Sequence, residues 1–275
     1  MADVTVVVAT RNRADELRRS LRRHHAPVIV ADNASADDTP EVAEAAGAEV
    51  VRLPRNLGAA ARNIGAERAA TPYVAFADDD SWWAPGALER AVRLLGSHPR
   101  AALLAARVLV GEDERLEPVS AQMARAPLGR PGGLPGPAVL GFLACSAIVR
   151  RDAFLGVGGF SPVLHFGGEE ELLALDLAAA GWGLAYVDEL VVHHHPSTAN
   201  RDPAARRRRE ARNRLLTAWL RRPLPAVARA TAAALTTRDG RAGLADAARV
   251  LPALALARRP VPPAVEAARA RLAGR

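Results

Sequence analysis

Short apolar runs rich in β-branched residues alternate with helical segments along the first part of the chain. The runs are VTVVVAT (4–10), PVIVADN (27–33), AEVVRLP (48–54) and PYVAFA (72–77), and a segment of helical character follows each of the first three. Such runs are typical of strands buried on both faces, and their alternation with helices favours a parallel sheet. The sequence therefore predicts an α/β fold with a doubly wound, mainly parallel sheet.

The rest of the chain divides into a continuation of this pattern and a helical tail. We expect a helix over 85–95, strands over 101–110, 138–151 and 184–192, and a helix over 169–180. Residues 112–137 are polar and rich in Pro and Gly, which predicts a mobile loop. From residue 201 the sequence is rich in Arg and Ala and is interrupted by prolines. These features predict an α/β domain over 1–200 and a helical C-terminal extension over 201–275.

Composition limits the class of protein. With 275 residues and 49% hydrophobic residues, the chain can bury a substantial core. Cys145 is the single cysteine, which excludes a disulfide framework or a cysteine metal site and indicates a reducing, cytoplasmic location. The N-terminus enters a strand directly, and no apolar run approaches eighteen residues, so we expect neither a signal peptide nor a membrane span.

Polar clusters follow all four of the first predicted strands. Ligands of open parallel sheets bind beyond the carboxyl ends of the strands, so these clusters are expected to meet at one edge. That convergence predicts a ligand site. Its candidate residues are Thr10, Arg11, Asn12 and Arg13 after the first strand, Asp32 and Asn33 after the second, Asn56, Leu57 and Gly58 after the third, and Asp78, Asp79 and Asp80 after the fourth.

The aspartate triplet places three like charges at the end of a buried strand, where they repel each other. Carboxylate oxygens suit hard cations such as Mg²⁺ or Mn²⁺. A cation with few protein ligands commonly completes its shell with phosphate oxygens, so a diphosphate is the expected partner. Arg11, Arg13 and Arg62 are suited to contact it. The alternative is a solvated turn that caps a helix.

A second polar cluster lies in the segment HFGGEEELLALDLAAAGW (165–182). Glu169, Glu170 and Glu171 occupy the first turn of a predicted helix, and one of them is expected to act as a general base. The alternative is that they are there because acidic residues are favoured at helix N-termini. His193, His194 and His195 end a later predicted strand, where one could complete a metal shell; the alternative is an ordinary surface or core histidine.

Taken in order, five segments resemble glycosyltransferase family 2, whose members have the GT-A fold. The segments are VVVATRNR, ADNASADDT, RNLGAAARNIGA, AFADDDSWWAPGAL and GGEEELLALDLAAAGW, and they lie between residues 4 and 197. The resemblance implies an inverting, metal-dependent transferase that moves a sugar from a nucleotide-diphosphate donor, such as a UDP-, GDP- or dTDP-sugar, to an unknown acceptor hydroxyl. The implied cofactor is Mn²⁺ or Mg²⁺.

The resemblance also implies roles for individual residues. Asp78–Asp80 resembles the Asp-X-Asp motif, with Asp80 as the firmest metal ligand, Asp78 as a second ligand and Asp79 near the ribose. Glu170 would be the catalytic base, and because the family usually has Asp there, Glu169 remains an alternative. His193 matches a late histidine that often reaches the metal. The implied donor-site residues are Thr10 to Arg13, Asp32 beside the base, Asn56, Gly58, Arg62, Asn63, Asp78 and Asp79.

Several alternatives remain open at this point. The Arg-rich segment 205–223 has the composition of a helix on an anionic membrane surface, or of a helix that packs on the catalytic domain. Trp82 and Trp83 could stack on a sugar or belong to the core. Nucleic-acid binding fits poorly because aromatic residues do not interleave with the arginines. The rival functions are a catalytically silent nucleotide- or saccharide-binding module and a sugar nucleotidyltransferase; the latter is disfavoured because ATRNRADE lacks glycine.

Overall fold

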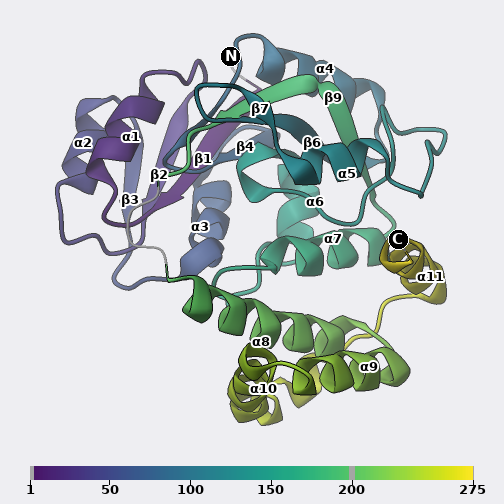
Figure 1. Cartoon of the computed structure of the whole chain (residues 1–275). Coiled ribbons are helices and arrows are strands. Elements are labelled where there is room, and N and C mark those ends of the chain that lie inside the picture. The colour runs from purple at the N-terminus through teal and green to yellow at the C-terminus, as the bar shows by residue number, and fades with distance from the viewer. Residues whose placement is uncertain (1–2, 198–201, 275) are drawn as a thin grey trace.

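The computed structural model describes residues 3–197 and 202–274 (Figure 1). Its first half is a parallel sheet of β1 (Val4–Thr10), β2 (Val28–Asp32), β3 (Glu49–Arg52) and β4 (Tyr73–Ala77), in the order β3-β2-β1-β4. The register sets Thr10 beside Asp32, so the polar ends of β1 and β2 lie at the same edge. The predicted parallel arrangement of these strands is confirmed.

The second half of the sheet mixes strand directions. Beyond β4 the order continues with β8 (Ala147–Arg150), β6 (Ala101–Val110), β9 (Gly183–His194) and β5 (Ser81–Trp83). The β6 and β9 strands are parallel, whereas β8 is antiparallel to both neighbours and β5 is antiparallel to β9. The short β7 (Arg115–Leu116) pairs with β6 at the side. The β5 strand was not expected from the sequence.

Helices cover both faces of the sheet, as predicted for a doubly wound fold (Figure 1). One face packs against α1 (Ala14–Leu21), α2 (Thr39–Ala45) and α4 (Ala87–Ser97). The other packs against η1 (Gly58–Ala60), α3 (Ala61–Arg68), α6 (Arg151–Gly156) and α7 (Glu169–Ala179). The side chains of β1 alternate between the two cores, because successive residues of a strand point to opposite faces.

Two expectations for residues 112–151 need correction. The stretch 112–137 is not wholly irregular, because it contains β7 and the helix α5 (Pro118–Ala124). Glu117 accepts a hydrogen bond from the Val119 amide and Pro118 takes the first helical position, a favourable start for a helix. The strand predicted over 138–151 is reduced to β8, preceded by η2 (Ala144–Ser146). The apolar residues before it pack against the core, and their pairing with β9 is limited to an isolated antiparallel bridge between Ala138 and Ala185.

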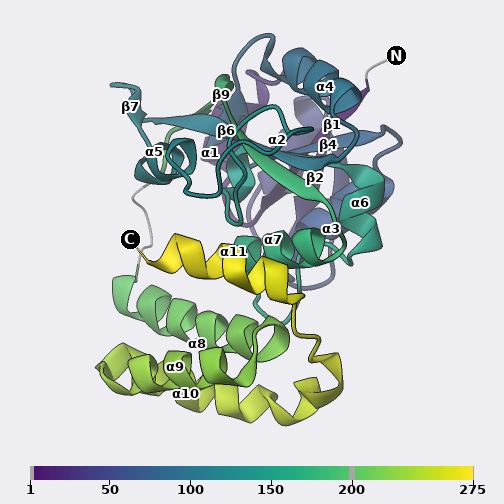
Figure 2. The ribbon, with the colours of Figure 1, turned by 90° about the vertical axis from the view of Figure 1, so that its right-hand side faces the viewer.

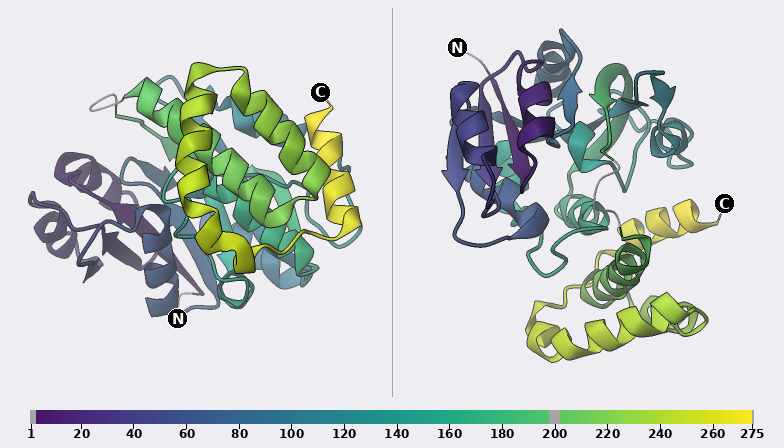
Figure 3. Two further views of the ribbon diagram at one scale, coloured as in Figure 1. Left: turned by 90° about the horizontal axis from the view of Figure 1, so that it is seen from below. Right: turned by 60° about the vertical axis from the view of Figure 1, so that its left-hand side comes forward.

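The C-terminal residues are helical, as predicted. They form α8 (Pro203–Arg221), α9 (Leu224–Leu235), α10 (Arg238–Val250), η3 (Pro252–Ala257) and α11 (Pro263–Ala273). The first three helices lie beyond α7, on the side away from the sheet, and α11 returns to lie along α7 (Figure 2). Figure 3 shows the same helical layer from below and from the side.

The α8 helix shares an apolar cluster with the α/β part of the chain. Leu215, Leu216 and Leu220 of α8 pack with Leu164 and Leu172. The apolar face of the segment 205–223 is thus covered by protein, which favours the packing alternative; a membrane contact through this segment stays a prediction. Within residues 3–197 and 202–274, none of the helices combines the length and the apolar character that a membrane span requires. The predicted domain boundary at 200/201 lies outside the described residues.

Candidate active site

The aspartate triplet forms a tight turn between β4 and β5. The Asp78 amide donates to the Ser81 hydroxyl at 2.8 Å, and the Ser81 amide donates to the Asp78 carbonyl at 3.2 Å. These bonds reverse the chain directly after the buried strand, so that β5 leaves in a new direction and pairs with β9. The turn presents Asp78 and Asp80 on one side and Asp79 toward the loop after β1.

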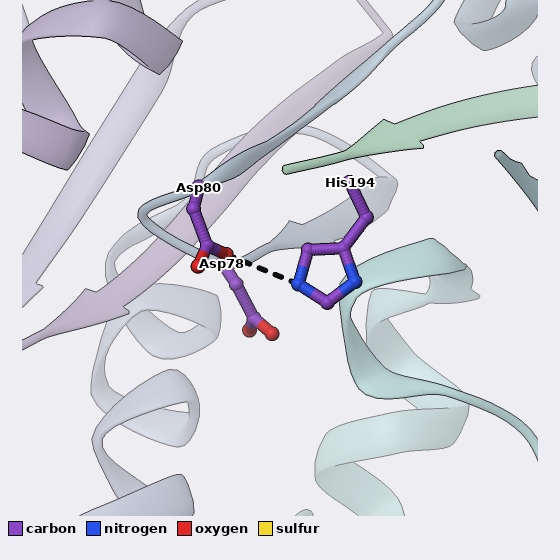
Figure 4. A group of neighbouring side chains, drawn as sticks. All are labelled: Asp78, Asp80 and His194. Atoms are coloured by element: carbon purple, nitrogen blue, oxygen red, sulfur yellow. Dashed lines mark ion pairs between the residues drawn. The ribbon is translucent and has the colours of Figure 1, made fainter. Parts of the chain in front are cut away.

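Asp78, Asp80 and His194 form a group that can hold a metal ion. One ligand atom from each lies within 4.8 Å of the others, and Figure 4 shows the imidazole beside the two carboxylates. His194 Nε2 lies 3.2 Å from Asp80 Oδ1. Two carboxylates and an imidazole are a donor set suited to a divalent cation.

The histidine beside the aspartates is His194, whereas the sequence-based prediction named His193. The β5–β9 register sets Ser81 opposite His194 and Trp82 opposite His193. Because neighbouring residues of a strand face opposite sides, only one of the two histidines can face Asp80. His193 instead stacks on Trp82 at 5.5 Å between ring centroids, and its Nδ1 lies 3.2 Å from Glu114.

Asp79 joins the triplet to the loop after β1. Its carboxylate accepts a hydrogen bond from the Thr10 hydroxyl at 2.9 Å and one from Arg13 Nε at 3.3 Å. Burial raises the pKa of Asp79 to about 7, and the charges of Asp80 and Asp78 add to this effect. Two residues of the predicted donor site are therefore tied to the aspartate turn.

Asp80 has the opposite electrostatic environment. Burial acts to raise its pKa, but the hydrogen bond and charge of His194 outweigh burial, together with the Ser197 amide and Arg13. The pKa of Asp80 is therefore lowered from its usual value. Its carboxylate is kept in the charged form that a cation requires.

Arg62 is a buried cation between the aspartates and the two glutamates. It is 4% exposed and pairs with Asp78, while its Nε has no hydrogen-bond partner among the described residues. Burial acts to lower the pKa of Arg62, but the charges of Asp78, Glu169 and Glu170 outweigh it and raise the pKa. An arginine in this position can compensate several carboxylates at once and retains a donor for a ligand.

Most of the remaining predicted donor-site residues lie at the ends of β1, β2 and β3. Arg11 is exposed, and Asn12, with a left-handed φ of 54°, accepts a hydrogen bond from the Ala36 amide. Asp32 is buried and accepts from the Ser35 amide and hydroxyl. The structure thus brings the first two strand ends into one polar rim.

The third strand end is organised around Gly58. Asn56 Oδ1 accepts from the Gly58 amide, and a Cβ at Gly58 would meet the His165 carbonyl oxygen at 2.2 Å. Asn63 lies apart from this rim. Its side-chain nitrogen donates to the Phe160 carbonyl and its side-chain oxygen accepts from the Phe160 amide, both at 2.8 Å. In this structure Asn63 holds the loop before α7.

Glu169 and Glu170 begin α7 directly after Gly167 and Gly168, both of which have left-handed φ values near 90°. Glu169 is 2% exposed and its Oε2 has no partner among the described residues, while Glu170 is partly exposed and faces a cavity. Burial raises the pKa of both, and the charge of Glu169 helps to raise the pKa of Glu170 to about 7. A carboxyl group tuned toward neutrality is suited to general base catalysis.

The loop before Glu169 is held from the C-terminal extension. Asn213 of α8 is 1% exposed, and its amide nitrogen donates to the carbonyls of Leu164, Phe166 and Gly167. Sequence reasoning missed this residue. An asparagine within the Arg-rich helix carries no local signal of a partner that precedes it by more than forty residues.

The tryptophans after the triplet belong to the core. Trp83 is fully buried, and its indole donates to the Phe76 carbonyl at 3.1 Å. Trp82 is buried between His193, His195 and Arg23, whose guanidinium carbon lies 4.1 Å from the ring. Of the two sequence-based alternatives, this arrangement favours core packing over sugar stacking.

Comparison with known proteins identifies the family. The sequence matches Glycosyl transferase family 2 over residues 5–157, more than half of the chain, and the match ends before Glu169. It is 36% identical to a pre-mycofactocin glycosyltransferase of Mycobacterium tuberculosis over 74% of this chain and 45% of the relative. It is 30% identical to an N-acetylglucosaminyl-diphospho-decaprenol L-rhamnosyltransferase of the same organism over 65% of this chain and 69% of the relative. The chain spans less than half the length of the first relative.

Solved structures show the same fold. A mannosyltransferase from Pyrobaculum calidifontis, in complex with GDP-Man and Mn²⁺, is 22% identical with a TM-score of 0.62, over 98% of this chain and 86% of that one. S. aureus TarS 1–349, in complex with UDP-GlcNAc, is 16% identical with a TM-score of 0.59, over 79% and 66%. The expected fold and family are both confirmed, and the chain belongs to glycosyltransferase family 2 with the GT-A fold.

Proposed function

We propose that this protein transfers a sugar from a nucleotide-diphosphate sugar to an acceptor hydroxyl with inversion at the anomeric carbon. One observation carries the proposal: the group Asp78, Asp80 and His194 lies across the buried Arg62 from a glutamate whose pKa is raised to about 7. The names of the relatives support transferase chemistry, and the nucleotide sugars in the two solved structures support this class of donor.

The donor set fits a divalent cation, with Mn²⁺ favoured over Mg²⁺. Asp78 and Asp80 supply hard oxygen ligands, and His194 supplies an imidazole nitrogen, a ligand that Mg²⁺ rarely takes. The lowered pKa of Asp80 keeps one ligand ionised. When bound, the cation supplies positive charge that balances the diphosphate.

The nucleotide would lie along the rim formed by the strand ends. Asp32 is proposed to contact the base, Asp79 to lie near the ribose, and the loop from Thr10 to Arg13 to contact the nucleotide. The Nε–H of Arg62 has no partner among the described residues and would point toward the diphosphate, because a buried guanidinium without its full set of acceptors is stabilised by an anionic ligand.

Glu170 is proposed to act as the catalytic base. Its carboxylate removes the proton of the acceptor hydroxyl while that oxygen forms a bond to the anomeric carbon. The bond from the anomeric carbon to the diphosphate oxygen breaks, and its electron pair leaves with the diphosphate. Attack from the face opposite the leaving group inverts the configuration. Glu169 is assigned a supporting role, because it is buried and its charge helps to raise the pKa of Glu170.

Thermal shift measurements test donor and metal binding. UDP, GDP and dTDP are each added with and without Mn²⁺ to the wild type, Asp80→Ala, His194→Ala and the matched control His193→Ala. One nucleotide at about 100 times its Kd should raise Tm by about 5–10 °C with Mn²⁺ present. The Mn²⁺-dependent part should vanish in Asp80→Ala and His194→Ala and persist in His193→Ala. If the Mn²⁺-dependent shift vanishes in His193→Ala and persists in Asp80→Ala and His194→Ala, the assigned ligand set is contradicted.

Release of the nucleoside diphosphate from the matching donor sugar tests turnover. Glu170→Gln should lose about 10²–10⁴-fold in rate and keep the nucleotide-dependent Tm shift, because it removes only the proton acceptor. If Glu169→Gln abolishes turnover and Glu170→Gln does not, the assignment of the base is reversed. A wild type that binds the nucleotide but turns over no donor with any hydroxyl compound would be a binding module.

A further inference from the structure

A cavity of about 650 Å³ opens beside Glu170. Its walls come from four parts of the chain that are distant in sequence: α5 with Met123, the segment 139–142 with Phe142, the start of α7 with Glu170, and α11 with Leu272. A volume of this size is typical of sites for small molecules. The cavity is separate from the strand-end rim proposed for the nucleotide, and Glu170 faces it.

The cavity wall is mainly apolar, and most of its charge is already compensated. Val139 and Phe142 belong to the sheet-facing core, and Met123 packs with them. Glu171 and Arg269 also line the cavity, but they pair with each other at 2.6 Å between Oε1 and Nε. Of the three charged residues in the wall, Glu170 is therefore the one whose carboxyl group is available to a ligand.

The outer wall is the C-terminal helix α11, which lies along α7 (Figure 2). Arg269 ties α11 to α7, and Glu266 ties it to Arg222 of α8 at 2.7 Å. None of the described side chains of α11 is buried, although Leu272 faces this cavity and Val265 faces a neighbouring cavity of about 430 Å³. The helix thus covers an apolar space that its own side chains do not fill.

We infer that this cavity binds the acceptor, and that the acceptor is an uncharged alcohol with an apolar body. The inference rests on the proposed function, because it uses Glu170 as the base. The hydroxyl would reach Glu170, while the body lies against Met123, Phe142 and Leu272. An acidic body could not pair with Arg269, because Arg269 is already paired with Glu171. It would also be repelled by the nearby carboxyl groups of Glu170 and Glu171. A neutral apolar body gains from the wall without that repulsion.

Binding of two simple glucosides tests the inference on the full chain. Phenyl β-D-glucoside and methyl β-D-glucoside carry the same hydroxyls and differ in the apolar group. Their Kd values are measured by saturation-transfer difference NMR for the wild type, for Leu272→Gln and for the matched control Ala270→Gln, with the nucleoside diphosphate present. Ala270 is exposed on the same helix and lines neither cavity.

We expect the wild type to bind the phenyl glucoside about tenfold more tightly than the methyl glucoside, as burial of a ring provides. Leu272→Gln should weaken phenyl glucoside binding about fivefold, and Ala270→Gln should leave it unchanged. Equal affinity of the wild type for both glucosides would overturn the inference without recourse to any variant. Equal affinities of the two variants for the phenyl glucoside would overturn the assignment of α11 as a wall of the site.

The nucleotide-dependent Tm shift, measured on the same samples, separates this inference from the proposed function. If the shift is present and the glucosides are not distinguished, the acceptor class is wrong and the donor site stands. If no nucleotide shifts the wild type, the proposed function fails, and a preference for the phenyl glucoside would then describe a ligand site but not an acceptor site.

Discussion

Replacement of Asn213 by alanine should loosen the loop that leads into Glu169 and Glu170. The Asn213 amide nitrogen lies 2.8, 3.1 and 2.7 Å from the carbonyl oxygens of Leu164, Phe166 and Gly167, and alanine removes all three bonds. Each bond contributes a net ~1 kcal/mol, and the sum is reduced because two N–H groups serve three acceptors. The free energy of unfolding should therefore fall by ~2–3 kcal/mol. That is a large part of the ~5–15 kcal/mol typical of a protein.

Urea unfolding measures this loss, and a thermal melt should show a fall in Tm of about 4–12 °C. Hydrogen exchange should speed up at the amides of residues 164–170 more than in β1 or β4, because the lost bonds are local. Arg214→Ala is the matched control, since Arg214 is exposed on the same helix and its loss should change stability by less than ~0.5 kcal/mol. A loss below ~1 kcal/mol for Asn213→Ala, with unchanged exchange in the loop, would refute the reasoning.

Three further results are expected. The pKa of Glu170 is raised by burial to about 7, so turnover should rise with pH through about 7. Because the ionised carboxylate is disfavoured in the folded protein, Glu170→Gln should raise Tm at pH 8 and leave Tm unchanged at pH 4, where the carboxyl group is protonated. Differential scanning calorimetry at the two pH values measures this difference. Arg62→Met removes a buried guanidinium from Asp78, whose side chain is 33% exposed, so the loss in urea unfolding should be ~2–3 kcal/mol, below the range for a fully buried pair; Arg68→Met, whose pair is exposed, should lose at most ~1 kcal/mol. Gly58→Ala should lower Tm by several degrees more than Gly86→Ala, since both have positive φ but only Gly58 meets backbone atoms within 3 Å; equal melting temperatures would contradict this.

Local sequence patterns were enough to predict the parallel half of the sheet and its polar edge. The β-branched runs of β1, β2 and β4 are buried on both faces, whereas the edge strand β3 is only partly buried. The polar residues at the carboxyl ends of parallel strands lie at one edge of the sheet, as the contact between Thr10 and Asp79 illustrates. The positions of the aspartate turn after β4 and of the two glutamates in the first turn of α7 also follow from short segments. Apolar content alone was not enough at residues 138–146, most of which are buried without forming a strand.

Tertiary structure decided the features that depend on pairing between distant segments. His193 and His194 are neighbours of the same residue type, and only the register of β9 against β5 turns His194 toward Asp80. The contact of Asn213 with the loop before α7 and the return of α11 beside Glu171 join segments 46 and 98 residues apart. Periodicity reports which face of an element is buried but not which element covers it, so these contacts arise only when the packed chain brings the faces together.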